Sequence, residues 1–76
     1  MMDFVEVDEK VYGYFIGWAN EHVEGIHSES IMVADRVVVK NKNKETIAYV
    51  HVAYGEAYFI RKDFYTSFTS LKEFRK

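Results

Sequence analysis

The sequence predicts a small α+β domain of order α-β-β-β-α, with a three-stranded antiparallel sheet and both helices on one face. Three observations support this prediction. Apolar residues recur at helical spacing over residues 8–25, strand-forming residues are concentrated over 31–61, and a second helical stripe covers 63–75. All 76 residues are expected to form a single domain, because no linker, repeat or low-complexity stretch divides them.

The first helix is predicted over residues 8–25. Asp8 is placed to cap the amides of its first turn, and Gly25 to end it in a left-handed conformation. Its apolar stripe comprises Tyr12, Phe15, Ile16, Ala19, Val23 and Ile26. A strand over 11–18 is the alternative interpretation, because β-forming residues are frequent in that segment.

An antiparallel meander is predicted next, with strands over roughly 31–40, 46–54 and 57–61. The polar segment 40–45 is expected to be the turn between the first two strands. Gly55-Glu56 suits a two-residue hairpin, since glycine permits the positive φ of a type II′ turn. Asp35-Arg36 interrupts the first strand and is interpreted as a bulge.

The closing helix is predicted over residues 63–75, with Asp63 as its N-cap. Its apolar stripe comprises Phe64, Phe68, Leu71 and Phe74. Basic residues gather near its C-terminal end, where the helix dipole favours cations. Several serine and threonine residues lower the helix propensity of its first half, so a late start is expected.

The composition indicates a folded protein of a reducing compartment. Hydrophobic residues make up 49% of the chain and aromatic residues 17%, which argues against disorder. Because the chain has no cysteine, it can form neither disulfides nor thiolate metal sites. The start of the chain lacks a signal-peptide pattern, and the longest uncharged apolar run, Val11–Ala19, is about half a membrane span. A cytoplasmic protein without a membrane segment is expected.

Histidines and serines are the candidates for chemistry, and their spacing predicts no catalytic, metal or cofactor site. His22, His27 and His51 lack the i, i+4 spacing that directs two rings to one metal ion. The serines lie in polar, loop-like stretches, and the four glycines are isolated, so no phosphate-binding loop is present. We therefore expect that the protein is not an enzyme; the weaker alternative is an enzyme that uses His51 with a carboxylate.

The leading functional hypothesis is a non-catalytic protein–protein interaction module, a small inhibitor, modulator or adaptor of a larger cytoplasmic protein. It follows from the missing catalytic set, the surplus of aromatic residues and a chain with nothing fused to it. Small proteins of this kind are often phage- or virus-encoded and act on host replication, transcription or defence. An exposed Trp and Tyr pair is typical of an interface hot spot. The binding surface is therefore expected on the first helix, at Tyr14, Trp18, Glu21 and His22.

A homodimer is expected from two further features. Gly13 and Gly17 have a small-xxx-small spacing that lets a helix lie flat on the sheet or on a second copy of the chain. Residues 1–30 carry a net charge of −6 and residues 31–76 a net charge of +4, so the halves of two copies attract each other.

The alternative function is nucleic-acid binding through a basic hairpin tip, with Lys40, Lys42, Lys44, Arg61 and Lys62 as the contacts. The predicted α-β-β-β-α order resembles that of double-stranded RNA-binding domains, which touch RNA with a hairpin loop and the start of the second helix. That family has a lysine cluster at the helix start, where this chain has Lys62-Asp63-Phe64-Tyr65-Thr66. The resemblance therefore concerns architecture alone.

Overall fold

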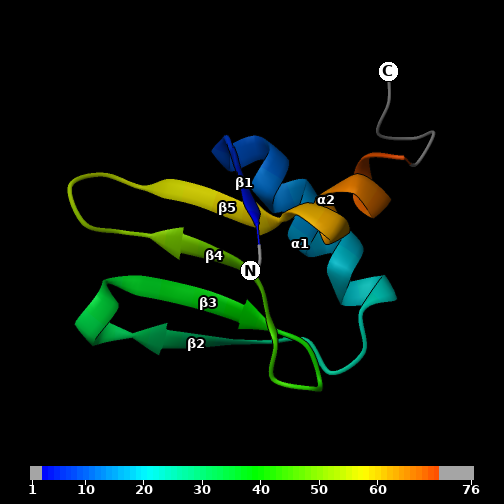
Figure 1. The fold of residues 1–76 in the computed structure, drawn as a ribbon, viewed down its shortest axis with the longest axis horizontal. Helices are drawn as coiled ribbons and strands as arrows, with labels where there is room; N and C mark the ends of the chain where they lie inside the picture. Colours follow the sequence, from blue (N-terminus) through cyan, green and yellow to red (C-terminus); the bar gives the residue numbers. More distant parts are fainter. Residues whose placement is uncertain (1–2, 71–76) are drawn as a thin grey trace.

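A computed structural model describes residues 3–70 and has an α+β fold with two helices and a five-stranded antiparallel sheet (Figure 1). The elements in chain order are β1 (Phe4–Val7), α1 (Glu9–His22), β2 (His27–Ile31), a 3-10 turn η1 (Met32–Ala34), β3 (Arg36–Lys40), β4 (Thr46–His51), β5 (Ala57–Arg61) and α2 (Lys62–Thr69). The α+β class is confirmed. The prediction of a three-stranded sheet is wrong, because two more strands flank the meander.

The sheet has the strand order β1-β5-β4-β3-β2, so β2 to β5 form a meander and β1 joins beyond β5. Val5 lies opposite Ile60 in β5, and Ala48 of β4 lies opposite Ile60 on its other side. These residues share the face that α1 covers. The two sheet edges are therefore β1 and β2, and of their residues only Ile31 was predicted as part of the sheet.

The segment predicted as one strand over 31–40 contains the last residue of β2, the η1 turn and all of β3. Asp35 adopts a left-handed conformation with φ 54°, and its amide donates to the Met32 carbonyl at 3.2 Å. This turn reverses the chain where a bulge was predicted. β4 ends at His51 instead of 54, and residues 52–56 replace the predicted two-residue turn, with positive φ at both Tyr54 and Gly55. The third strand of the prediction, 57–61, is confirmed as β5.

The helical interpretation of the first segment is confirmed, and α1 spans Glu9–His22. The Asp8 carboxylate accepts a hydrogen bond from the Val11 amide at 2.9 Å, as predicted for an N-cap. Tyr12, Phe15 and Ala19 of the predicted stripe are buried against the sheet. They form one core with Val39, Ile47, Ala48, Ile60 and Phe68.

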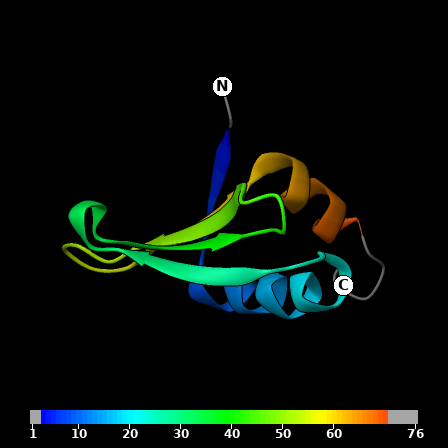
Figure 2. The same ribbon diagram turned by 90° about the horizontal axis from the view of Figure 1, so that it is seen from below.

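The second helix begins and ends earlier than predicted. α2 spans Lys62–Thr69, and Asp63 lies in its first turn, because the N-cap position belongs to Arg61. The predicted stripe residues Leu71 and Phe74 lie outside the described residues. In Figure 2 α1 runs below the sheet, whereas α2 lies above it at the end of β5, so the two helices do not share one face as predicted. Phe68 nevertheless reaches Phe15 of α1, with ring centroids 5.6 Å apart.

Two turns hold the connections in place. Gly25 has φ 69° and lies so close to Lys42 that an added Cβ would be 2.4 Å from the lysine Cβ. The Lys42 amide donates to the Glu24 carbonyl at 3.0 Å, which ties the end of α1 to the β3–β4 turn. Within that turn the buried Asn41 side chain accepts from the Asn43 and Glu45 amides, both at 3.0 Å.

Candidate protein-interaction surface

Five large apolar side chains are exposed at one end of the sheet; we name this group the hairpin end. It comprises Ile31, Met32, Val33, Val52 and Tyr54. The exposed fraction is 85% for Met32, 98% for Val33 and 106% for Tyr54. The loops that carry these residues project together from the end of the molecule opposite α2 in both Figures 1 and 2. Exposed apolar side chains grouped in this way are typical of a binding surface, whereas isolated ones are common on any protein.

The backbone links the two loops of the hairpin end. The Val52 amide, just after β4, donates to the Asp35 carbonyl at 2.9 Å, so the start of the β4–β5 loop is held against the η1 turn. At the end of the same β4–β5 loop, the hydroxyl of Tyr58 in β5 donates a hydrogen bond to the Glu56 carboxylate. This bond raises the pKa of Tyr58 to about 12, because ionisation would place two negative charges together. The two loops are thus tied to each other, and the β4–β5 loop is tied to β5, although the loop tips are exposed.

A shallow hollow of about 210 Å³ lies beside the η1 turn. Met32, Val37 and Val52 contribute apolar wall, and Asp35 and Arg36 contribute charge at its margin. The hairpin end therefore presents protruding side chains next to a concave area, and a partner surface could fit both. Binding of a partner to this surface would require no catalytic residue.

Known proteins offer no guide to the role of this surface. No family model, no curated protein and no solved structure gives a significant match to the chain.

The surface predicted on α1 is only partly exposed. Tyr14 is 55% exposed, and Glu21 and His22 are exposed, but Trp18 is half-buried against the core. The Trp18 ring stacks on His22 with centroids 5.2 Å apart, and the His22 Nδ1 lies 2.9 Å from the Trp18 carbonyl oxygen. The structure thus brings Trp18 and His22 together, but it places Trp18 where it also supports the core.

The indole of Trp18 packs between the two helices. Its ring centroid is 5.7 Å from that of Phe15 and 5.8 Å from that of Phe68. Its Nε1 is buried and finds no hydrogen-bond partner among residues 3–70. A Trp18 substitution would therefore disturb the contact between α1 and α2 as well as any interface, and it cannot test the interface alone.

Gly13 and Gly17 face open space. A Cβ added at either position would meet nothing within 4 Å in the described structure. The prediction that they let α1 lie flat on the sheet is therefore wrong, since the side of α1 that touches the sheet carries Tyr12, Phe15 and Ala19. Contact of this glycine side with a second copy of the chain stays a prediction.

Carboxylates pair with three of the five basic residues proposed for nucleic acid. Lys42 lies 2.8 Å from Glu24, and Lys40 lies 3.3 Å from Glu29. The buried Arg61 donates two hydrogen bonds to Asp63, at 2.8 and 2.9 Å. Lys44 and Lys62 are exposed. Carboxylates thus partly neutralise the predicted basic patch, and the β-α-β-β-β-β-α order also departs from that of double-stranded RNA-binding domains.

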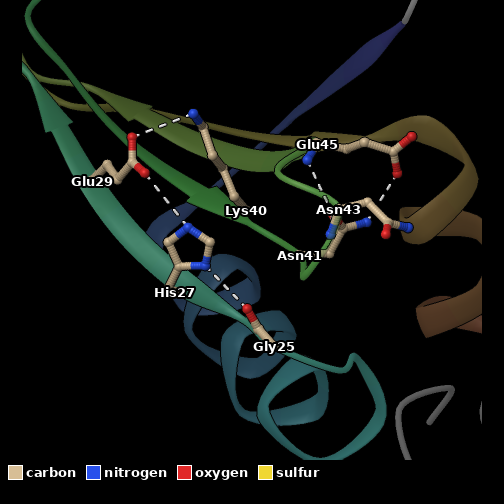
Figure 3. A network of polar contacts seen from close by, with 7 residues as sticks. All are labelled: Gly25, His27, Glu29, Lys40, Asn41, Asn43 and Glu45. Atoms are coloured by element: carbon tan, nitrogen blue, oxygen red, sulfur yellow. Dashed lines mark hydrogen bonds and ion pairs between the residues drawn. The ribbon is translucent and has the colours of Figure 1, made fainter.

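A polar network lies along β2 and β3 (Figure 3). Glu29 stands between His27, whose Nε2 is 3.5 Å from the carboxylate, and Lys40. The hydrogen bond from Lys40 is the main cause that lowers the pKa of Glu29, so this carboxylate stays ionised at neutral pH. The His27 Nδ1 lies 3.0 Å from the Gly25 carbonyl oxygen, which fixes the ring at the start of β2.

The sheet face opposite α1 carries an aromatic row. The Tyr49 ring stacks on Phe59 at 4.8 Å between centroids and meets the Phe4 edge at 5.1 Å. The Arg36 guanidinium lies over Tyr49, 4.5 Å from the ring centroid. His51, the candidate for a catalytic base, is half-buried and lies opposite Arg36 in the β3–β4 register.

Within residues 3–70, no group of three or more histidine and acidic side chains is arranged to hold a metal ion. Neither described helix combines the length and apolar character needed to cross a bilayer.

Sequence reasoning missed the hairpin end, although a signal was present. The run Ile31-Met32-Val33-Ala34 is apolar and falls at the start of the strand predicted over 31–40. Asp35 follows it, and aspartate is among the residues that tolerate the left-handed region of a turn. An apolar run that belongs to a turn has no sheet face to bury it, so its side chains remain exposed.

Proposed function

We propose that the protein is a non-catalytic protein–protein interaction module that binds a larger partner through the hairpin end. The observation that carries the proposal is the exposure of Met32, Val33 and Tyr54 on two loops at one end of the molecule. Burying these side chains in a partner would yield roughly 25 cal/mol for each Å² of apolar surface removed from water. This is the main source of affinity available to a small rigid domain.

The shape of the hairpin end defines the class of partner. Protruding methionine, valine and tyrosine side chains fit an apolar groove or pocket on another protein, with Tyr54 as an aromatic anchor. The finer proposal is an inhibitor or modulator of a host replication, transcription or defence machine. Its support is the grouped apolar surface of the hairpin end.

The test compares retention of a partner by immobilised wild-type protein and by the double variant Met32→Asp/Val33→Asp. We expect the affinity to fall about tenfold or more, since charge in a desolvated contact costs over 1.4 kcal/mol. Both side chains are almost fully exposed, so the free energy of unfolding should change by about 0.5 kcal/mol or less. Chemical denaturation of each variant checks that expectation.

Matched controls separate this surface from the one predicted on α1. Asn20→Asp/Asn43→Asp adds the same charge at two exposed positions elsewhere and should leave retention unchanged. Glu21→Lys changes the exposed acidic side of α1. If Glu21→Lys abolishes retention and the hairpin-end variant does not, the binding surface lies on α1 and the hairpin end is the wrong location.

A further inference from the structure

The outer edge of the sheet at β2 is open. All five residues of β2, His27–Ile31, are exposed, and within residues 3–70 the strand pairs only with β3. The N–H and C=O groups that point away from β3 are therefore available to another strand. No proline or lysine occupies β2, and its pairing with β3 is regular over all five residues. Proline, lysine and a bulge, three of the features that prevent edge pairing, are therefore absent from this strand.

The side chains of β2 are complementary to those of a second, antiparallel β2. His27 and Glu29 share one face of the sheet with Lys40, as their contacts show (Figure 3). If two copies align with Ser28 opposite Ser28, each His27 lies opposite Glu29 of the second copy. Opposite-charge or hydrogen-bonding pairs at facing positions stabilise an antiparallel ladder.

A neighbouring register centred on Glu29 also keeps the faces matched but is less favourable. With Glu29 opposite Glu29, two carboxylates would face each other at the centre of the interface, which is destabilising. Ser28 and Ser30 project from the other face, next to Val39 and Val37 of β3 in the register. Small hydroxyl side chains on this face leave room for the second copy. Charge therefore favours the register centred on Ser28 over the one centred on Glu29.

We propose that two copies of this chain pair edge to edge through β2, antiparallel, with the two-fold axis at Ser28. The result is one continuous sheet with five strands from each copy. This surface shares only Ile31 with the hairpin end and does not rest on the function proposed above. Because the two β2 strands run in opposite directions, the two hairpin ends point away from each other, and the dimer is bivalent for its partner.

Single cysteines test the register, because the wild-type chain contains none. In Ser28→Cys the two new thiols face each other, with Cβ atoms about 5 Å apart. In the matched variant Ser30→Cys, each thiol lies opposite Ile26 of the second copy, and the two thiols are roughly 13 Å apart along the strands. We expect Ser28→Cys to form a covalent dimer on mild oxidation and Ser30→Cys to stay largely monomeric on a non-reducing gel. Equal cross-linking of both variants would overturn the register.

The oligomeric state tests the pairing itself. Sedimentation equilibrium of the wild-type protein at high micromolar concentration should show a dimer. His27→Glu places carboxylates opposite each other and should weaken dimerisation about tenfold, whereas the swap His27→Glu/Glu29→His restores opposite pairs and should recover it. A wild-type monomer, or a swap that stays as weak as His27→Glu, overturns the proposal.

Hydrogen exchange distinguishes a second copy from another occupant. The outward amides of β2 should become protected as the wild-type concentration rises. Protection that appears only when an extended peptide is added to a monomeric protein would assign the edge to a foreign strand and overturn the dimer. The Met32→Asp/Val33→Asp variant should still dimerise, so failure of the dimer and failure of the hairpin end are distinguished.

Discussion

Glycines in this chain have opposite structural consequences at different positions. Gly25 has positive φ and touches the backbone of Lys42, with 2.8 Å between an added Cβ and the lysine Cα. Gly13 lies in α1 with φ in the helical range and open space around it. At the first position only glycine fits the backbone; at the second, glycine merely lowers helix propensity.

Alanine substitution should therefore change stability in opposite directions. Gly25→Ala should lower the free energy of unfolding by about 2 kcal/mol or more, from left-handed strain and the clash with Lys42. Gly13→Ala should raise it by about 0.5–1 kcal/mol, since the helix gains propensity without a clash. Urea denaturation of the two variants measures both values. A destabilised Gly13→Ala would mean that the glycine side of α1 is covered, as a helix-mediated dimer requires.

At the scale of elements, one ion pair sets the junction between β5 and α2. Arg61 ends β5 with its side chain only 11% exposed, and Asp63 in the first turn of α2 accepts two hydrogen bonds from it. The Asp63 Oδ1 also accepts from the Phe64 amide at 2.9 Å. The bond from Arg61 is the main cause that lowers the pKa of Asp63. The Arg61 guanidinium also lies 4.8 Å from the Phe64 ring centroid, so its positive charge packs against the first turn of α2.

This pair should make stability depend on pH through Asp63. A carboxyl with a lowered folded-state pKa stabilises the fold above its unfolded pKa, about 3.9, and this contribution is lost as the pH falls through the folded pKa. Asp63→Asn should cost about 1 kcal/mol near neutral pH, because the carboxylate is largely exposed and screened. The difference from wild type should disappear toward pH 2.

Urea denaturation at both pH values measures this difference. Asp3→Asn, at an exposed carboxylate outside the pair, is the matched control and should cost little at either pH. A deficit of Asp63→Asn that persists unchanged in acid would show that the carboxylate charge does not contribute.

At the scale of the whole molecule, charge is distributed as local pairs. The acidic N-terminal half and the basic C-terminal half meet through Glu24–Lys42 and Glu29–Lys40. The uneven charge of the sequence is thus partly neutralised inside one chain by the fold. It is therefore weaker support for attraction between two copies, or between the lysines and an anionic partner, than the sequence alone indicates.

Nucleic-acid binding should accordingly be weak. Fluorescence anisotropy with labelled duplex RNA and single-stranded DNA should show no micromolar affinity even at low salt, about 50 mM. The double variant Lys42→Gln/Lys44→Gln should then give the same anisotropy as the wild-type protein. Micromolar binding with a steep salt dependence that this double variant reduces would restore the lysine tip as the functional site.

Local signals were sufficient for part of this architecture. The sequence by itself determined α1 with its Asp8 cap, the strand 57–61 and the α+β class, because capping, helical spacing and β-propensity act between residues close in the chain. The sequence also lists the aromatic and charged residues, but it does not tell which of them are exposed.

Only the tertiary structure decided the rest, because those outcomes depend on residues far apart in the chain. β1 has four residues and becomes a strand by pairing with β5, and β2 is polar and becomes one by pairing with β3. Trp18 is half-buried because Phe68, fifty positions away in the sequence, packs against its ring. The exposure of Met32 and Val33 follows from a turn that the helices do not cover. Burial is a property of the assembled fold, so a pattern of apolar residues predicts an interface only after the core has been assigned.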